Sequence, residues 1–270
     1  MDWLRREGAP LSERVWKAID DAATRSAKQE LAARRIADFE GPKGWEHVAE
    51  PLGTRQPRPA RPQARSAAQC SVPDAMLLSE IRQNFSIAWG SIDAYERGAR
   101  VLDTLPAERA AREVALAEDD LAFHGGPGGA GFLGGEGPRV RLGDWSNPGQ
   151  VAGDLLSGVS KLDEAGIAGP YAAVLDPRHY YAYLRAAAER RLSTEADRLE
   201  GLFSGIYRSS VVRGGGVFSL RGGDFLLVTG GDLTLGYRFH DDTAVHLFCV
   251  ETIGAHRLTP NAVCLLDAGS

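Results

Sequence analysis

Few residues of this chain combine the type and the spacing that catalysis or metal binding needs. The nucleophile pattern Gly-x-Ser-x-Gly does not occur, and Gly201-Leu-Phe-Ser204-Gly205 misses it by one residue. The nearest candidate metal ligands are His246 and Cys249, with His256 beyond them. Side chains alternate between the two faces of a strand, so an even and an odd position such as His246 and Cys249 cannot share a metal ion. The residues therefore predict no catalytic group and no metal site.

A glycine-rich segment at residues 124–137 contains a nucleotide-binding pattern in the wrong context. Eight glycines fall in the 13 positions after His124, and Gly129-Ala-Gly131-Phe-Leu-Gly134 is formally a G-x-G-x-x-G, with Asp154 following 20 residues later. A dinucleotide site needs these glycines between a strand and a helix, so that the pyrophosphate meets the helix N-terminus. Here they follow a helical pattern, which favours a tightly turning surface loop.

Acidic pairs and aromatic residues have an ordinary interpretation as well as a functional one. Runs such as Glu118-Asp119-Asp120 and Asp241-Asp242 do not form catalytic carboxylate pairs, since residues i and i+1 point in different directions on a helix. We expect them on solvated helix faces or in turns. Trp89 and Tyr95 could form a platform for a flat ligand, but packing in a core or an interface is favoured.

The first half of the chain predicts two long helices separated by an extended arm. Ser12 is a plausible N-cap for an amphipathic helix of about 20 residues, and residues 104–124 predict a second long helix. Between them, residues 55–65 carry four arginines and three prolines without a large apolar side chain, so they cannot build a core. Three interpretations stay open for this arm: an exposed segment, a nucleic-acid patch, or a contact with another subunit.

The second half predicts helices followed by strands. Asn147 and Pro148 fit the N-cap and first position of a helix that ends at Gly166. A buried strand at 171–175, a helix from Pro177 to about Ala188 and a further helix at 194–203 come next. Period-two patterns then predict a C-terminal antiparallel sheet, so the fold class is α+β. The strand candidates are residues 206–212, 217–220, 225–229, 233–239, 243–253 and 262–266.

Composition excludes several classes of protein. The 270 residues include 31 basic and 36 acidic side chains, a formal charge of −5, so a general nucleic-acid binder with a basic face is not expected. Three cysteines without a Cys-x-x-Cys pattern support neither a disulfide framework nor a zinc ribbon, which favours a reducing, cytoplasmic location. No stretch is apolar enough to predict a signal peptide or a membrane span.

Several segments, in order along nearly the whole chain, resemble the encapsulins, the linocin-like shell proteins of bacterial and archaeal nanocompartments. They share no single decisive motif, but their order and spacing together are specific. The segments are Ala-Arg-Arg-Ile-Ala-Asp-Phe-Glu-Gly-Pro-Lys-Gly (33–44), Asp-Ala-Tyr-Glu-Arg-Gly (93–98), Leu-Ala-Glu-Asp-Asp-Leu-Ala-Phe-His-Gly (116–125), Gly-Ile-Ala-Gly-Pro-Tyr-Ala-Ala-Val-Leu (166–175), Arg-Gly-Gly-Asp-Phe (221–225), Val-His-Leu-Phe-Cys-Val-Glu-Thr (245–252) and Pro-Asn-Ala-Val-Cys-Leu-Leu (260–266).

The resemblance implies a major-capsid fold of the Hong Kong 97 phage type. Such a fold has a P-domain with a long spine helix, an A-domain at the symmetry axes and an extended E-loop. The implied division is an N-terminal luminal helix and the start of the P-domain at 1–49, the E-loop at 50–83, the P-domain with its spine helix at 84–138, the A-domain at 139–225, and the C-terminal P-domain sheet at 226–270.

The resemblance also implies a function: a non-enzymatic shell protein. It would form a homo-oligomer of sixty subunits or a larger icosahedral multiple and enclose a cargo enzyme through that enzyme's C-terminal targeting peptide. Ferritin-like iron-storing proteins and dye-decolourising peroxidases are the expected cargoes. The implied cargo-binding residues are Leu31, Arg34, Ile36, Asp38, Asp232 and Leu233. The implied pore residues are Glu189, Arg190, Arg191 and Ser193.

One departure from the family pattern limits what the resemblance implies about a cofactor. Some encapsulins bind flavin through a tryptophan just before the Asp-x-x-Glu-Arg-Gly stretch, but Gly90 occupies that position here and Trp89 lies one residue earlier. We therefore expect no cofactor, with flavin as the alternative. The competing functions are a linocin-like bacteriocin or peptidase, and a capsid protein of a phage or prophage. No nucleic-acid or membrane partner is expected.

Overall fold

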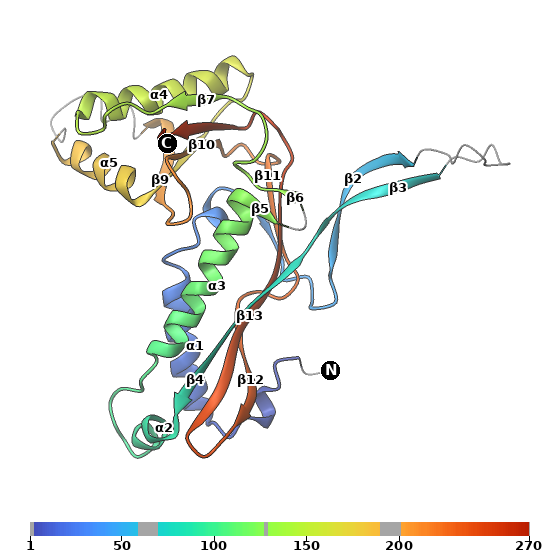
Figure 1. The fold of residues 1–270 in the computed structure, drawn as a ribbon, viewed down its shortest axis with the longest axis vertical. Coiled ribbons are helices and arrows are strands. Elements are labelled where there is room, and N and C mark those ends of the chain that lie inside the picture. The colour runs from blue at the N-terminus through green and yellow to red at the C-terminus, as the bar shows by residue number, and fades with distance from the viewer. Residues whose placement is uncertain (1–2, 59–69, 127–128, 190–200, 270) are drawn as a thin grey trace.

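The structure, a computed structural model, describes residues 3–58, 70–126, 129–189 and 201–269. It consists of two sheet-and-helix units with a two-stranded ribbon that extends from one of them (Figure 1). The elements are η1 (Arg6–Gly8), α1 (Glu13–Ala27), η2 (Ala33–Arg35), β1 (Asp38–Glu40), β2 (Ala49–Arg58), β3 (Cys70–Leu77), β4 (Ser79–Ala88), α2 (Trp89–Glu96), α3 (Leu105–His124), β5 (Gly125–Gly126), β6 (Gly129–Ala130), β7 (Arg139–Arg141), α4 (Pro148–Glu164), β8 (Tyr171–Leu175), α5 (Pro177–Glu189), β9 (Phe203–Arg208), β10 (Gly215–Ser219), β11 (Phe225–Thr229), β12 (Thr234–His240), β13 (Ala244–Arg257) and β14 (Val263–Asp267).

The first unit packs α1 and α3 against a five-stranded sheet. Its strands run in the order β1-β11-β13-β12, and β4 also pairs with the long strand β13. Val245, Leu247 and Cys249, at alternate positions of β13, are completely buried in the same core as the helices. From α1, Val15 and Ile19 enter the same core. The apolar stripes of the two helices therefore bury one face of this sheet.

The second unit is a mixed five-stranded sheet with α4 and α5 packed on it. The strand order is β7-β14-β10-β8-β9, and all five residues of β8 are buried. A cluster of Phe123, Phe132, Phe218 and Phe225 joins this core to the end of α3, with ring centroids 5.2–6.2 Å apart. The end of the spine-like helix α3 is thus packed into the second unit as well as the first.

Strands β2 and β3 form an antiparallel ribbon that extends away from both units (Figure 1), although Met76 at its base is buried beside Gly254 of β13. Val72 and Leu77 of this ribbon are about half exposed, at 49% and 53%. Strand β3 leads directly into β4, which begins at Ser79 and belongs to the first unit's sheet. The extended part of the predicted 50–83 segment therefore ends near residue 77. Residues 59–69, which hold most of the arginine- and proline-rich run, lie outside the described residues.

Most helix and strand predictions from local patterns are confirmed. The Ser12 hydroxyl accepts a hydrogen bond from the Val15 amide, and the Asn147 side chain caps α4 by accepting from the Gly149 amide. Helix α1 ends at Ala27, after 15 residues rather than about 20. The helix predicted at 194–203 falls mostly outside the described residues, and Phe203 already begins β9.

The prediction of one C-terminal antiparallel sheet is wrong. Strands β11, β12 and β13 belong to the first sheet, whereas β9, β10 and β14 belong to the second. Three of the pairings, β1 with β11, β14 with β7 and β8 with β9, are parallel. Alternation of apolar residues identifies a strand but not its partner, which explains the error.

The glycine-rich segment folds back on the end of α3. Strands β5 and β6 pair, and the amides of Phe132 and Leu133 donate to the carbonyls of Ala122 and Phe123 at 2.8 and 2.9 Å. A Cβ atom on Gly131 would lie 2.5 Å from the backbone of Phe123. The described glycines of this segment therefore serve a close backbone approach that returns Phe132 to the core, and the segment begins directly after helix α3, whereas a nucleotide site needs its glycines between a buried strand and a helix.

Candidate functional site

Arg34 lies at the centre of a charged network between η2, α3 and β13. Its Nε and Nη2 atoms donate to Oε1 and Oε2 of Glu118, both at 2.7 Å. Nη2 also lies 2.9 Å from Oδ1 of Asp232 and 3.2 Å from Oε2 of Glu251. The structure thus brings the predicted residues Arg34 and Asp232 together and adds two acidic residues to them. The bidentate contact with Glu118 fixes the orientation of the guanidinium plane.

The two added glutamates are completely buried, and burial changes the protonation of Glu251. Glu118 and Glu251 each have 0% exposure. Burial raises the pKa of Glu251 well above its ordinary value, and the neighbouring Glu118 carboxylate raises it further, although Arg34 opposes the shift. Burial alone would lower the pKa of Arg34, but its contacts with Glu118 outweigh this and raise it. The arginine is therefore charged, and Glu251 keeps a proton more readily than an ordinary glutamate does.

Beside this network lies a partly exposed apolar surface. Leu31 and Leu233 are half-buried and pack against the first unit's core. The ring of Phe39 is 37% exposed, and the guanidinium of Arg34 lies over it at 4.6 Å from the ring centroid. An apolar centre with a charged rim is suited to a short peptide with apolar side chains. We call Leu31, Arg34, Phe39, Asp232 and Leu233 the groove.

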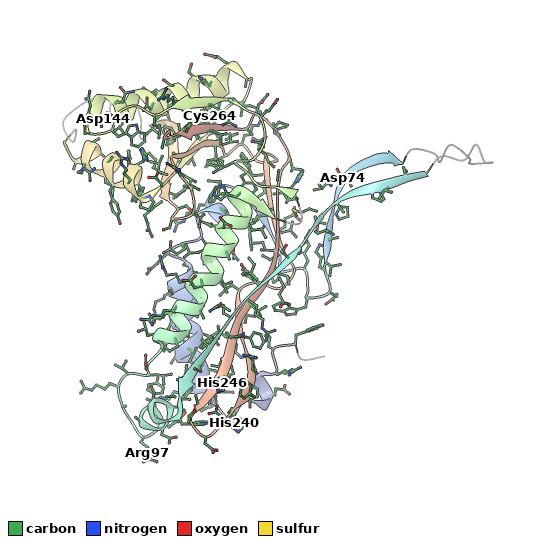
Figure 2. All side chains as sticks on the ribbon, viewed as in Figure 1. Asp74, Arg97, Asp144, His240, His246 and Cys264 are labelled. Atoms are coloured by element: carbon green, nitrogen blue, oxygen red, sulfur yellow. The ribbon has the colours of Figure 1, made fainter. Side chains whose placement is uncertain are left out.

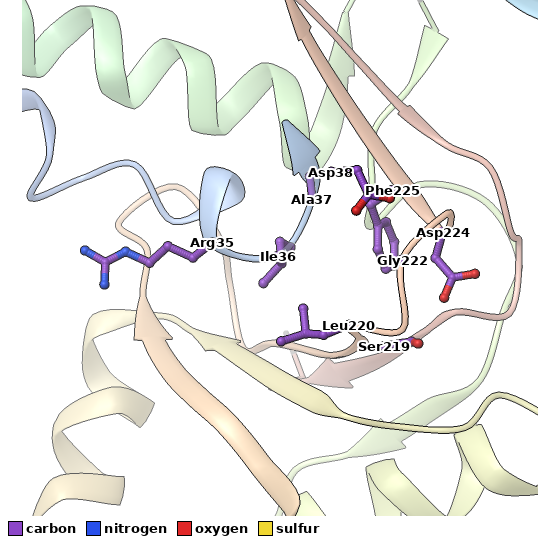
Figure 3. A pocket seen from close by; sticks show the side chains of 9 residues that line it. All are labelled: Arg35, Ile36, Ala37, Asp38, Ser219, Leu220, Gly222, Asp224 and Phe225. Carbon is purple, nitrogen blue, oxygen red and sulfur yellow. The ribbon is translucent and has the colours of Figure 1, made fainter. Parts of the chain in front are cut away.

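Ile36 and Asp38 belong to a neighbouring cavity rather than to the groove. The cavity has a volume of about 220 Å³ and lies between β1 and the loop before β11 (Figure 3). Ile36 is only 5% exposed, and the Asp38 carboxylate accepts a hydrogen bond from the Gly223 amide at 2.6 Å. The six predicted cargo-binding residues therefore divide into two adjoining groups, four of them in the groove and two in the cavity.

A third buried acidic residue, Asp119, holds the turn after α1. Its carboxylate accepts hydrogen bonds from the amides of Ala32 and Ala33, at 3.2 and 2.9 Å, and from the hydroxyl of Ser209, at 2.9 Å. Burial raises the pKa of Asp119 to about 7, against the opposing effect of these hydrogen bonds. Asp119 thus connects the first unit to the chain just after β9 in the second.

Glu30 is another buried carboxylate that connects the two units. Its side chain is 4% exposed and pairs with Arg112 of α3 at 2.9 Å and with Arg208 of β9 at 3.5 Å. Because Arg112 lies on α3 and Arg208 in the second unit, Glu30 bridges the two. A buried carboxylate between two arginines is strongly position-specific, since removal of either partner leaves charge uncompensated.

The prediction that the acidic run 118–120 is a solvated helix face is wrong for two of its three residues. Glu118 and Asp119 are buried, and only Asp120 is exposed. Helical spacing indicates that Glu118 is on the buried face of α3, because it lies three residues after the buried Ala115 and four before the buried Ala122. Their partners, at η2, β13 and Ser209, are 80 or more residues distant and could not be found locally.

The predicted pore residues are largely outside the described part of the chain. Helix α5 ends at Glu189, and Arg190, Arg191 and Ser193 follow within the undescribed residues 190–200. The pore assignment therefore stays a prediction.

Trp89 and Tyr95 do not share a flat surface. The Trp89 indole N–H donates to the Asp241 carbonyl at 2.7 Å, and its ring meets His240 edge-on at 5.9 Å. Tyr95 is covered by the Arg14 guanidinium, 4.1 Å from its ring centroid. Both pack around the first unit's core, as the sequence favoured. Flavin binding stays untested.

The predicted separation of His246 and Cys249 on opposite strand faces is confirmed. His246 pairs with Asp241 at 2.8 Å, whereas Cys249 is completely buried in the core. His246 and the other buried cysteine, Cys264, lie at opposite ends of the molecule (Figure 2). Among the residues that the structure describes, no three His, Cys, Asp or Glu side chains are grouped as a metal site. Nor does any helix in the described ranges have the length and apolar character to cross a bilayer.

Comparison with known proteins identifies the family. The family model described as "Encapsulating protein for peroxidase", of the linocin type, matches residues 1–254. The chain belongs to the encapsulin family. It is 33% identical over 267 residues to the type 1 encapsulin shell protein of Rhodospirillum rubrum, covering 97% of this chain and 95% of the relative. It is 31% identical over 268 residues to that of Rhodococcus erythropolis, covering 97% and 98%.

Solved structures confirm the capsid fold of this encapsulin. A virus-like particle protein from Pyrococcus furiosus superimposes with a TM-score of 0.65 at 17% identity, covering 94% of this chain and 99% of that one. The capsid protein of the phage XM1 gives 0.58 at 10% identity, covering 88% and 91%. The predicted α+β capsid fold and the encapsulin resemblance are thus both confirmed, and the chain is a shell protein of this family.

Proposed function

We propose that this encapsulin assembles into an icosahedral shell of sixty subunits or a larger multiple, and that the shell encloses a cargo enzyme. The observation that carries the assembly is the ribbon of β2 and β3. It has exposed apolar side chains and no core of its own, and an isolated two-stranded ribbon is marginally stable. A neighbouring subunit supplies what it lacks, and repetition of that contact closes a symmetric particle.

Deletion of the ribbon tests the assembly. Residues 50–76 can be replaced by a short Gly-Ser linker, because Ala49 and Leu77 are cross-strand neighbours. This deletion leaves all of β4 in the first sheet, unlike one that extends to residue 83. Light scattering and negative-stain electron microscopy should show closed particles for the full chain and small soluble species for the deletion. Normal particles from a deletion variant with an unchanged circular dichroism spectrum would contradict the proposal.

We place cargo docking at the groove and its adjoining cavity. Leu31, Phe39 and Leu233 offer apolar contacts, and the charged network around Arg34 fixes their surroundings. Ile36 and Asp38 would accommodate a neighbouring part of the peptide in the cavity. Many such sites in one particle would retain an oligomeric cargo by avidity, even if each site is weak.

The cargo proposal is tested with targeting peptides fused to green fluorescent protein. The C-terminal peptides of a ferritin-like protein and of a dye-decolourising peroxidase from the same genome serve as two probes, and fluorescence that sediments with the shells reports capture. Leu233→Asp should abolish capture, because it places a charge in an apolar contact. Val101→Asp, at a position that is 80% exposed, is the matched control. Equal capture by both variants would refute the assignment.

The identity of the cargo is a separate part of the proposal. The family description names a peroxidase, and a more distant relative from Kuenenia stuttgartiensis is a diheme-cytochrome-encapsulin fusion. We propose a peroxidase or an iron-storing ferritin-like protein in a cytoplasmic compartment, and the two fluorescent probes distinguish them. The shell itself is proposed to be non-enzymatic, so peptidase activity that follows purified, cargo-free particles would contradict that part.

A further inference from the structure

The buried glutamate pair beneath the groove contains an oxygen without a hydrogen-bond donor. Oε2 of Glu251 lies 3.2 Å from Nη2 of Arg34, but Oε1 is buried and accepts from no described donor. The carboxylate of Glu118, whose two oxygens both accept from Arg34, lies within hydrogen-bond contact of Glu251. An ionised, buried oxygen without a donor is costly, whereas a protonated carboxyl group carries no charge and can itself donate a hydrogen bond.

The charge count supports the same protonation. Three carboxyl groups, those of Glu118, Asp232 and Glu251, surround the single cation Arg34. With Glu251 protonated, one arginine faces two carboxylates, one of them 42% exposed to water. With Glu251 ionised, two adjacent buried carboxylates would share one guanidinium. Like charges in such a site cannot both be ionised without a large cost.

We propose that Glu251 holds a proton beside Glu118, and that loss of this proton draws Arg34 away from Asp232 and opens the rim of the groove. Nη2 of Arg34 now lies closer to Asp232, at 2.9 Å, than to Glu251, at 3.2 Å. An ionised Glu251 competes for this nitrogen. Asp232 lies in the turn between β11 and β12, immediately before Leu233 of the groove, so the turn loses its ion pair with Arg34 and keeps its hydrogen bonds to Thr252. The proton thereby controls the groove in which we place cargo, a consequence that rests on the proposed function.

The other groups around Glu251 leave Glu251 as the titrating group of this network. Helix α3 contributes Glu118, η2 contributes Arg34 and the β11–β12 turn contributes Asp232. On its own strand, the Cys249 thiol stays neutral because burial raises its pKa. On β4, the register partner of Glu251 is the apolar Ile81. Since ionisation of Glu251 is penalised in the folded state, the stability of the subunit also falls as pH rises toward the raised pKa of this group.

Hydrogen exchange in assembled shells tests the switch without cargo. Mass spectrometry follows peptides that span residues 230–236 from about pH 6 to about pH 10, a range that covers raised carboxyl pKa values in buried sites. Light scattering confirms intact particles at each pH. Glu251→Gln keeps the size and a donor toward Glu118 but does not titrate. We expect exchange in the wild type, relative to Glu251→Gln at the same pH, to rise about tenfold per pH unit and then level off.

Asp232→Asn is the second variant, because it weakens the contact that the switch breaks. Its exchange at 230–236 should be fast at the lower pH and independent of the switch. A wild-type to Glu251→Gln ratio that does not change with pH would overturn the proposal, and so would an Asp232→Asn variant with the full wild-type rise.

Electron cryomicroscopy of wild-type shells gives a measurement that needs no variant. At the higher pH the Arg34–Asp232 contact should be broken, and an intact contact would overturn the switch. Capture of the fluorescent probes separates the two proposals. If the Arg34–Asp232 contact breaks at high pH but capture does not change, only the docking site is refuted. If the probes are captured but the contact does not respond to pH, only the proposed protonation of Glu251 is refuted.

Discussion

The pKa of Asp119 makes a quantitative prediction about the stability of the subunit. The carboxyl group has a pKa of 3.8 in an exposed setting and of about 7 in the folded protein, because it is completely buried. The folded state therefore holds a proton that the unfolded state releases between these two values. The contribution of Asp119 to stability must therefore fall as pH rises from about 4 to about 7 and stay level above that.

The size of this effect follows from the shift. Each unit of pKa difference corresponds to about 1.4 kcal/mol, and the group is half-titrated near pH 7, so the interval from about pH 5 to about pH 7 costs the wild type about 2 kcal/mol at this residue. Asp119→Asn removes the titration and keeps one oxygen acceptor for the Ala33 amide. Since a protein of this size shifts its melting temperature by roughly 2–4 °C per kcal/mol, the wild type should lose roughly 4–8 °C relative to the variant over that interval.

The assay is differential scanning fluorimetry of both proteins at matched pH values, with Asp120→Asn as the control. Asp120 is the exposed neighbour of Asp119 on the same helix, so its variant should follow the wild-type curve. The variant and the wild type share every other titrating group and the same assembly contacts, so their difference isolates Asp119. Parallel curves for the wild type and Asp119→Asn, or a wild type that gains relative stability as pH rises, would refute the argument.

Three further substitutions follow from the packing and charge of the two units. Arg34→Ala should lower the free energy of unfolding by about 3–5 kcal/mol, because it leaves Glu118 buried without a cation; urea denaturation measures this, and Arg35→Ala, at an exposed position, should change little. Phe132→Ala should cost about 3–5 kcal/mol by opening a cavity in the aromatic cluster, whereas Phe132→Leu should cost less than half as much in the same assay. Gly131→Ala should lower the melting temperature, because its Cβ would meet the Phe123 backbone at 2.5 Å; a melting temperature equal to that of the wild type would show that the glycine-rich turn is not needed for this approach.

Local patterns in the sequence predicted individual elements well and their partners poorly. Ser12 and Asn147 were recognised as helix caps because the capping interaction involves residues only two or three positions away. The partners of β14 were not recognised, because it pairs with β10 and β7 in the second unit although β13 precedes it in the chain. Strand alternation contains no information about which distant edge a strand joins.

In the candidate site, too, individual residues were predicted but most of their contact partners were not. The resemblance supplied Arg34, Asp232 and Leu233, which the structure brings together in the groove. It did not supply Glu118 or Glu251, which determine the charge of Arg34's surroundings. Both had been assigned no role, Glu118 because adjacent acids on a helix do not face each other. That rule holds within the helix, but it says nothing about the groups that other elements bring to each residue.

Glu118 and Asp119 are consecutive in α3 and point toward different parts of the molecule. Glu118 meets Arg34 beside β13 in the first unit, and Asp119 meets Ser209 in the second. One turn of α3 therefore holds η2 from both sides, through the side chain of Arg34 and the amide of Ala33. Apolar residues in these positions would avoid the desolvation of two carboxylates, so stability alone does not explain them. The carboxylates also restrict geometry, because each accepts hydrogen bonds only from donors in particular places. Their contacts with Arg34, the Ala33 amide and Ser209 therefore constrain the angle between the two units. In a closed shell an error in that angle is repeated in every subunit. A fixed angle between the units can therefore outweigh the loss of stability that two buried carboxylates cause.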